Sequence, residues 1–307
     1  MNGRISRKLG RIRRQCSLIM TGHLLNWPWR SRLERRRIRY EATQKSALRY
    51  LCRYLPDIAA IEPTGSLRKE KEPERVFTLW LQGEENAPEI VKACFRSMRR
   101  HLKQEVVLQD EKTLFDWISI PDEIVEKWRK GKMRAAHFSD ICRVDLLYRH
   151  GGYWLDATDF VTAPIPEKIE AQDFFMFMSG SKIRGSYSFV QNCFIRSRKG
   201  NPLIEVWRNA MLQYWNSENS VINYFTHQLL FKLAVENNPY ARSAFEKMLK
   251  KEQDATHTVW DTHKGEPFDA ENFLELTKDA FFQKTEYKTA VSKQPPEGSY
   301  AAVIQSL

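Results

Sequence analysis

The segment from Ala136 to Asp159 holds the residues of this chain whose types and spacing indicate chemistry. It reads as a helix that ends at the pair Gly151-Gly152 and continues into a short apolar strand. Acidic side chains follow this strand, with Asp156 first and Asp159 three positions later. Carboxylates without a neighbouring cluster of histidine or cysteine ligands suit a hard cation such as Mg²⁺ or Mn²⁺. Because such cations commonly neutralise phosphates, the segment indicates a nucleotide-diphosphate donor.

Asp140 and Arg143 lie three positions apart in the expected helix, so they share one of its faces. One interpretation is an intrahelical ion pair, which is a common feature of helices. The surrounding segment is mostly apolar, however, and burying an idle charge there would be costly. We therefore prefer a functional interpretation, in which Asp140 accepts hydrogen bonds from sugar hydroxyls and Arg143 binds the sugar or a phosphate.

The elements around this segment predict an α/β fold. Strands and helices alternate from residue 75 onward, and this order implies a parallel, doubly wound sheet with ligands at the carboxyl ends of its strands. Further on, two strands suit an antiparallel pair and two helices follow them. The predicted strands are 76–81, 105–108, 174–178 and 187–195, and the predicted helices are 89–98, 122–129, 136–148, 203–215 and 221–235.

Residues 136–143 and 151–158 resemble the signature of bacterial capsular polysaccharide synthesis glycosyltransferases. That family belongs to the sugar transferases with a DXD motif, which include the initiating mannosyltransferases of yeast and the clostridial glucosylating toxins. Residues 80–88 resemble the family's first strand and donor loop, and the similarity covers about residues 75–235. The resemblance implies a GT-A-like fold with a Rossmann-type mixed sheet flanked by helices. Its nucleotide-binding half would span about residues 71–165 and its acceptor half about residues 166–307.

The resemblance also implies roles for single residues, with Trp80 lying against the nucleobase. The expected catalytic residues are Asp140, Arg143 and Asp156, and the expected donor-binding residues are these three with Trp80, Gln82, Gly83 and Trp154. Other polar residues, among them His137, Asn192 and the run 223–228 with His227, could border the site. For each of these the expectation is a place in the core or on the surface.

The metal site departs from the family pattern at its second position. Asp156 would be the first aspartate of the DXD motif, but position 158 holds Thr158. Asp159 comes next, and in a regular strand it would point to the opposite face unless a bulge turned it back. The candidate metal ligands are therefore Asp156, Thr158 and Asp159, with Mn²⁺ or Mg²⁺ as the cofactor.

These residues predict a metal-dependent glycosyltransferase of the hexosyl type. It would move a sugar from a nucleotide-sugar donor to a growing capsular or lipopolysaccharide glycan, and the wider group retains the anomeric configuration. Two alternatives stay open. One is a nucleotide-sugar hydrolase or nucleotidyltransferase, which addition to a glycan would distinguish. The other is a non-catalytic, sugar-binding scaffold of polysaccharide assembly, which the altered DXD motif leaves open and which donor turnover would exclude.

The charge of the chain is concentrated at its N-terminus. Residues 1–54 hold 15 Lys and Arg residues and two acids, a net charge of +13, whereas the whole chain of 307 residues carries +11. Residues 1–70 are thus expected to form a basic, partly helical arm with a linker, which precedes the transferase domain of residues 71–307. Trp27 and Trp29 favour a membrane surface over a solvated tail, and a nucleic acid is the least expected partner.

Location is predicted from the same features. Five widely spaced cysteines without a CxxC pattern indicate reduced thiols and a cytoplasmic protein. With the basic arm, we expect the chain to lie at the inner face of a bacterial membrane, beside a lipid-linked or oligosaccharide acceptor.

The arm generates a testable prediction. Each basic residue near an anionic surface adds about 1 kcal/mol of attraction, so the full chain should sediment with vesicles that contain anionic lipid and should be released at high salt. Removal of residues 1–54 should abolish sedimentation. Vesicle binding that survives the truncation would instead place the membrane surface in the core.

Overall fold

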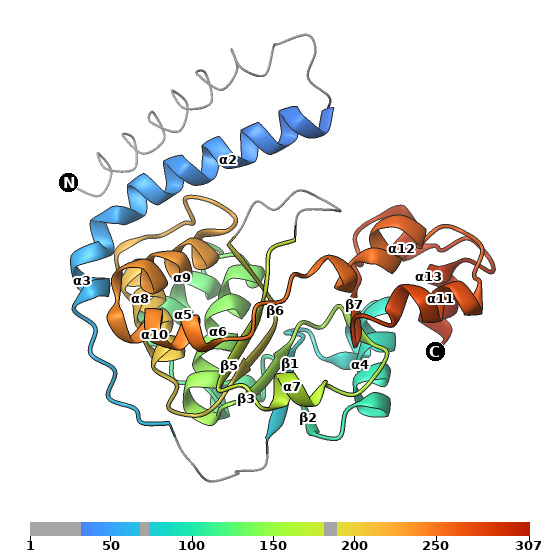
Figure 1. Ribbon diagram of the computed structural model, residues 1–307, viewed down its shortest axis with the longest axis horizontal. Helices are drawn as coiled ribbons and strands as arrows, with labels where there is room; N and C mark the ends of the chain where they lie inside the picture. Colours follow the sequence, from blue (N-terminus) through green and yellow to red (C-terminus); the bar gives the residue numbers. More distant parts are fainter. Residues whose placement is uncertain (1–31, 68–73, 181–188) are drawn as a thin grey trace.

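The computed structural model of the protein describes residues 32–67, 74–180 and 189–307 (Figure 1). Five strands form its central sheet, namely β1 (Arg75–Leu79), β2 (Glu105–Gln109), β3 (Gly152–Leu155), β5 (Phe174–Met178) and β6 (Val190–Ser197). Their order is β2-β1-β3-β6-β5. β1 lies parallel to β2 and β3, whereas β6 is antiparallel to β3 and β5. The expected α/β fold with a mixed sheet is thereby confirmed.

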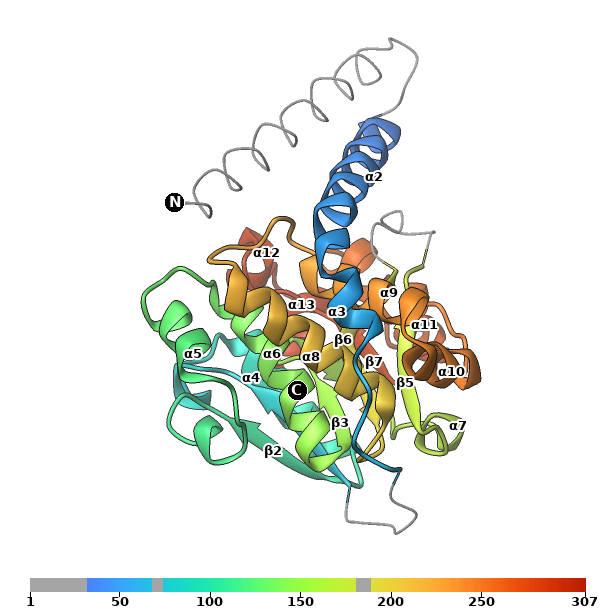
Figure 2. The same ribbon diagram turned by 90° about the vertical axis from the view of Figure 1, so that its left-hand side faces the viewer.

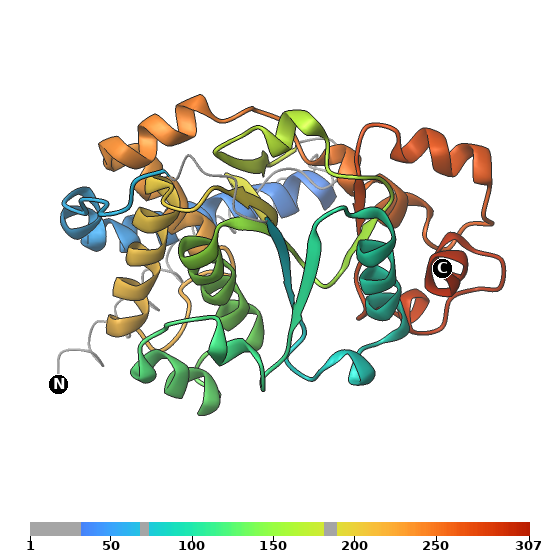
Figure 3. The same ribbon diagram turned by 90° about the horizontal axis from the view of Figure 1, so that it is seen from below.

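Helices cover both faces of this sheet (Figures 1 and 3). α4 (Glu89–His101) follows β1 on one face, and α6 (Ala135–His150) packs against β1, β3 and β6 on the other. Behind α6 lie α8 (Pro202–Ser217) and α9 (Thr226–Asn237), which contact each other. The remaining helices are α2 (Arg32–Leu51), α3 (Leu55–Ala59), α5 (Asp122–Arg129), α7 (Glu167–Glu170), α10 (Pro239–Lys247), α11 (Ala270–Thr277), α12 (Ala290–Lys293) and α13 (Tyr300–Ser306).

The sequence patterns explain most of these elements. The apolar positions of α4 recur at helical spacing, and all of them are buried. Asn201 caps α8 by accepting a hydrogen bond from the backbone N–H of Leu203 at 2.9 Å. The helix predicted over 221–235 begins later, at Thr226, because Asn223 takes up the preceding backbone in a turn. Its side chain accepts from the N–H of Phe225, and its carbonyl accepts from the N–H of Thr226.

A second, two-stranded sheet was not predicted from the sequence. β4 (Asp159–Val161) pairs antiparallel with β7 (Phe282–Lys284), and Asp159 lies opposite Lys284 in the register. This pairing brings the C-terminal part of the chain next to the end of β3. In Figure 1 that part, drawn in orange and red, lies beside α4, and α13 contacts α4.

The second half of the expected arm packs on the rest of the chain. Leu51 and Ile58 are fully buried, and α3 contacts α8 and α9. The Asn238 side-chain amide donates to the carbonyls of Ile58 and Ile61 at 3.1 and 2.8 Å. Only the earlier part of α2 leads away from the body (Figure 2). The domain boundary near residue 70 stays a prediction, but a truncation at residue 54 would remove core contacts, so a cut after residue 31 is the cleaner test of the arm.

Several sequence predictions lie outside the described residues. These are the first 31 residues of the basic arm with Trp27 and Trp29, residues 68–70 at its end, and the first residues of the strand predicted from 187. Within the described ranges no helix combines the length and the apolar character needed to cross a bilayer. Of the four cysteines described, Cys94, Cys142 and Cys193 are buried, Cys52 is exposed, and none forms a disulfide.

The junction between α6 and β3 depends on two glycines. Gly151 ends the helix at φ 68°, and Gly152 starts the strand at φ 92°, as the sequence predicts for a sharp turn. A Cβ at position 152 would lie 2.4 Å from the carbonyl oxygen of Arg75 on β1. The turn therefore needs both the backbone freedom and the small size of glycine.

Gly152→Ala is expected to destabilise the protein by about 3 kcal/mol, from backbone strain plus the contact with β1. Gly131→Ala is the matched control, because Gly131 also has a positive φ of 66° but a Cβ there would meet nothing within 4 Å. The control should cost about 1 kcal/mol. Denaturant unfolding of both variants measures the difference, and equal losses would show that close approach to β1 is unimportant.

Candidate active site

A cavity of about 470 Å³ opens at the carboxyl ends of β1 and β3. Most of the residues predicted for the site line it, although they come from separate elements. Trp80 and Gln82 follow β1, Asp140 and Arg143 come from α6, Trp154 lies in β3, and Asp156 and Thr158 follow β3. Two predicted residues are not part of this lining: Gly83 forms a turn behind Trp80, with its N–H donating to the Trp80 carbonyl at 2.9 Å, and Asp159 is fully buried.

Arg143 links two carboxylates across the site. Its Nη2 lies 3.2 Å from Asp140 Oδ1 within α6 and 3.1 Å from Asp156 Oδ1 beyond β3. Its Nη1 donates to the carbonyl of Asn192 at 2.6 Å, and its guanidinium lies 5.0 Å from the centre of the Trp154 ring. The intrahelical ion pair is therefore present, but it is one part of a contact that also joins α6 to β3 and β6.

Asp156 is held by three donors. Oδ1 accepts from the Trp154 indole N–H at 2.8 Å as well as from Arg143, and Oδ2 accepts from Lys284 Nζ at 2.7 Å. Burial opposes ionisation of this carboxyl group, but the charges of Arg143 and Lys284 outweigh it and lower the pKa of Asp156. The side chain is thus a fixed carboxylate at the floor of the cavity.

The chain turns directly after Asp156, which corrects the expected position of Asp159. The N–H of Asp159 donates to the carbonyl of Asp156 at 2.9 Å, and the N–H of Asp156 donates back to Asp159 Oδ2 at 3.1 Å. Because β3 ends at Leu155, strand alternation does not govern Asp159, and no bulge is needed to bring the two carboxylates to the same side. Thr158 lies between them, and its carbonyl accepts from the backbone N–H and the hydroxyl of Thr285.

Lys284 is a site residue that the sequence did not reveal. Its Nζ lies 2.7 Å from Asp156 Oδ2 and 3.0 Å from Asp159 Oδ1, and its side chain lines the cavity. Burial lowers the pKa of this lysine, but the two carboxylates outweigh that effect and leave it raised. Burial raises the pKa of Asp159 to about 7. Lys284 opposes this shift, but the negative charge of the neighbouring Asp156 adds to it.

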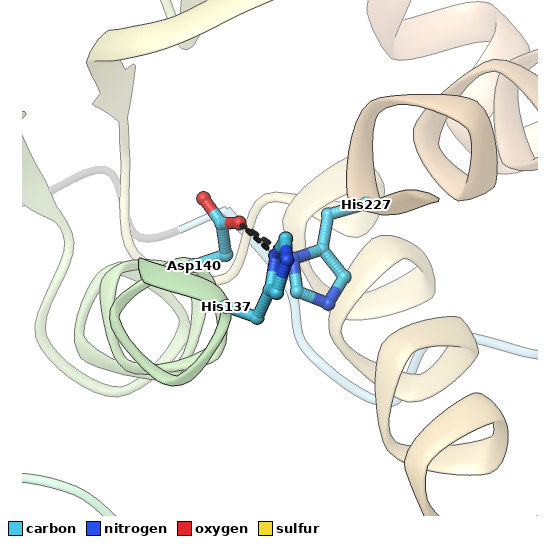
Figure 4. Close-up of side chains that lie close together, drawn as sticks. All are labelled: His137, Asp140 and His227. Atoms are coloured by element: carbon cyan, nitrogen blue, oxygen red, sulfur yellow. Dashed lines mark hydrogen bonds and ion pairs between the residues drawn. The ribbon is translucent and has the colours of Figure 1, made fainter. Parts of the chain in front are cut away.

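Asp140 is the centre of a second group of polar residues, which the sequence suggested only as core or surface positions. Asn192 Nδ2 donates to Asp140 Oδ1 at 2.8 Å, and His227 Nδ1 lies 2.8 Å from Oδ2. His137 Nδ1 lies 3.6 Å from the same oxygen (Figure 4). All of these side chains are buried. Burial opposes ionisation of Asp140, yet Arg143 and His227 lower its pKa.

The group His137, Asp140 and His227 has three potential metal-ligand atoms within 4.8 Å of one another. A tryptophan fixes the role of His227, however. Trp215 Nε1 is 2.8 Å from His227 Nε2, and an indole nitrogen can only donate, so Nε2 accepts and Nδ1 carries the proton that Asp140 accepts. Both ring nitrogens are therefore engaged. His227 positions the Asp140 carboxylate and has no lone pair for a metal ion, whereas His137 Nδ1 has no hydrogen-bond partner among the described residues.

The residues expected to bind Mn²⁺ or Mg²⁺ fit that role poorly. Both oxygens of Asp156 accept hydrogen bonds, and Asp159 shares its carboxylate between Lys284 and the backbone N–H of Asp156. Asp159 is also closed off from the cavity. Thr158 alone offers a hydroxyl at the cavity lining, and a single neutral ligand does not make a site for a hard divalent cation.

Aromatic side chains form the rim of the cavity. The rings of Trp80 and Tyr287 meet edge to face at 5.2 Å, and the Trp80 indole nitrogen has no hydrogen-bond partner among the described residues. Tyr224, on the side of α9, is 64% exposed although it is a large aromatic residue. The sequence selected Trp80 by resemblance, but nothing in the local pattern pointed to Tyr287.

Comparison with known proteins adds family information to this geometry. Residues 29–303 match a family described as "Capsular polysaccharide synthesis protein". The chain is 31% identical over 106 residues to the O-glycosyltransferase braB of Annulohypoxylon truncatum, 29% identical over 115 residues to the glycosyltransferase afumC of Aspergillus fumigatus, and 24% identical over 119 residues to the O-glycosyltransferase PaGT of Phomopsis amygdali. These matches cover 33–37% of this chain and 25–29% of those fungal relatives.

A solved structure titled "PaToxG Glycosyltransferase" aligns with 68% of this chain and 89% of its own length, at a TM-score of 0.39 and 13% identity. At that level of similarity it supports no inference about the site.

The network around His227 predicts a specific pH effect. Burial lowers the pKa of His227 more than Asp140 raises it. At acidic pH, the imidazole of His227 is therefore protonated in the unfolded chain but not in the folded protein. This contribution lowers stability as the pH falls below about 6.5. Trp215→Phe frees Nε2 for that proton. The free energy of unfolding should then fall less steeply on acidification, by up to about 1.4 kcal/mol per pH unit.

Trp207→Phe is the matched control, since the Trp207 indole donates at 2.9 Å to the backbone carbonyl of His227 and not to its ring. Asp159, with its raised pKa, acts in the opposite direction between pH 4 and 7, so the comparison is between the two variants. Urea unfolding at pH 5 and pH 7 measures it. The same pH slope in both variants would contradict the assigned tautomer.

Proposed function

The chain belongs to the capsular polysaccharide synthesis protein family, and from this premise we propose that it is a glycosyltransferase that moves a sugar from a nucleotide-sugar donor to a glycan acceptor. The observation that carries the proposal is the convergence of Asp140, Arg143 and Asp156 on one cavity at the carboxyl ends of β1 and β3. Open α/β sheets bind ligands at this end. The fungal relatives named as glycosyltransferases support the same reaction class.

The chemistry of the cavity suits a leaving diphosphate. Two cations, Arg143 and Lys284, line it, and each retains N–H donors beyond those used for protein contacts. Buried, fixed donors of this kind stabilise negative charge as it develops on a leaving group. Trp80 and Tyr287 offer aromatic faces for a nucleobase at the rim.

We further propose that the reaction retains the anomeric configuration. An inverting transferase needs a carboxylate or another base to take the proton of the acceptor hydroxyl. Asp140 and Asp156 are the acids among the described residues that line the cavity, and neighbouring cations lower the pKa of both carboxyl groups, which makes them weak bases. A front-face displacement, in which the leaving phosphate oxygen takes the proton, requires no such base.

We also propose an acceptor and a location for the protein. The family description favours a capsular glycan, and the basic N-terminal residues favour work at an anionic membrane surface. The chain carries seven basic residues and both Trp27 and Trp29 within residues 1–31. Deletion of that segment alone retains Leu51 and Ile58, which are fully buried.

Arg143→Gln tests the function directly. Incubation of the protein with a panel of nucleotide-sugars and an oligosaccharide acceptor should yield a glycan with the donor's anomeric configuration, assigned by NMR. Arg143→Gln should lower kcat/KM by about 100-fold or more, because it removes donors from the leaving group. Release of free sugar without any glycan product would favour the hydrolase alternative, and binding without turnover would favour the scaffold.

Arg208→Gln is the matched control. Arg208 pairs with Asp145, which is fully buried on α6, and lies outside the cavity lining. Each variant breaks a buried pair and should lose about 3 kcal/mol of stability. Only Arg143→Gln, however, should also show the large loss of kcat/KM. Parallel losses of activity in both would make Arg143 a structural residue. A product of inverted configuration would refute the proposed course.

A further inference from the structure

Lys284 lies where a glycosyltransferase of the DXD group is expected to hold its metal ion. Its ammonium group is between the two carboxylates that follow β3, at 2.7 Å from Asp156 and 3.0 Å from Asp159. These are the acids that the sequence assigned to the metal. Arg143 approaches Asp156 from the other side at 3.1 Å. Together the lysine and the arginine bring the same formal charge as one divalent cation.

The backbone holds Lys284 in this position. β7 pairs with β4 so that Lys284 is directly opposite Asp159, and the next residue, Thr285, donates both its N–H and its hydroxyl to the carbonyl of Thr158. On the other side, the Gln283 side chain bonds the carbonyl of Ala255 and the N–H of Val259. The ammonium could leave the two acids only by turning its own side chain, because the strand that carries it is fixed on both sides.

We propose, on the basis of the proposed transferase function, that Lys284 is the cation held by Asp156 and Asp159, in place of a divalent metal ion, and that with Arg143 it binds the leaving diphosphate. Lysine has three N–H donors. Lys284 donates one to Asp156 Oδ2, and its ammonium group forms an ion pair with Asp159 Oδ1. A further N–H is available to a phosphate oxygen in the cavity, which both Lys284 and Arg143 line.

In the transfer, the bond between the anomeric carbon and the β-phosphate oxygen breaks, and a bond from that carbon to the acceptor oxygen forms. The acceptor proton passes to the departing phosphate oxygen, and the electron pair of the broken bond stays on the diphosphate. The charge that builds there meets two fixed cations, so no water has to reorient as the bond breaks. Asp156 and Asp159 then act as supports that aim the cations and not as metal ligands.

The test uses the full chain, inorganic pyrophosphate as the probe and Mn²⁺ as the competing ion. Calorimetry in EDTA should detect pyrophosphate binding without any divalent ion, and electron paramagnetic resonance in the absence of pyrophosphate should find no stoichiometric Mn²⁺ on the protein. Lys284→Met should weaken pyrophosphate binding in EDTA by about tenfold or more, the value of one charge-assisted hydrogen bond. Lys288→Met is the matched control, since Lys288 is exposed, lies beside the same strand and should leave the affinity unchanged.

Three results would overturn the inference: pyrophosphate binding that requires Mn²⁺, one bound Mn²⁺ that Asp156→Asn abolishes, or wild-type affinity in Lys284→Met. Because Lys284→Met leaves Asp159 buried and unpaired, a double variant with Asp159→Asn guards against misfolding. The measurements on the unmodified protein decide the question without either variant. They also separate the two proposals, since an absence of sugar transfer would refute the function while these binding data still assign the cation.

Discussion

A row of alternating charges, Asp140, Arg143, Asp156, Lys284 and Asp159, is the interaction on which the rest of the structure depends. Its members come from α6, from the turn after β3, and from the β4–β7 pair. An isolated ion in such a buried place would cost several kcal/mol, and only its neighbours in the row compensate for it. The position of each element is therefore coupled to that of the others. Through Lys284, the row ties the C-terminal part of the chain to the end of β3.

Local patterns were sufficient to predict one side of this row. The apolar periodicity of α6, the glycine pair and the short strand all follow from neighbouring residues, and Asp140, Arg143 and Asp156 were selected on that basis. Lys284 could not be found in this way, because it reaches Asp156 only through pairing across 128 positions of sequence. The turn at Asp159 escaped for a different reason. Asp156 marks the end of the apolar run 153–155, but nothing in the sequence shows that the backbone turns there, so side-chain alternation was extended to Asp159.

The contacts of His227 with Asp140 and Trp215 illustrate the same limit. A histidine in a mostly apolar helix is more often a packed residue than a functional one, and its sequence gives no sign of a partner 87 positions away. Once Trp215 fixes its tautomer, His227 can only donate to Asp140. Asn192 fixes the other oxygen of that carboxylate, so Asp140 presents one orientation to Arg143. The orientation of Arg143 thus depends on Asp140, which in turn is held by Asn192 and His227.

A lysine and a metal ion impose different designs on a diphosphate site. A metal ion accepts several oxygens at once, so two carboxylates and two phosphate groups can share it. An ammonium group is a point charge with three donors, and that of Lys284 already faces two carboxylates, so few of its donors remain for phosphate oxygens. A second cation must then face the remaining phosphate oxygens, and a guanidinium with its fork of donors is suited to that task. Arg143 and Lys284 lie on opposite sides of Asp156, which is the arrangement that this division of labour requires. On this assignment the positive charge of the site is carried by side chains of the chain itself. The site therefore does not require an aspartate at position 158 as a second metal ligand, and Thr158 is compatible with it.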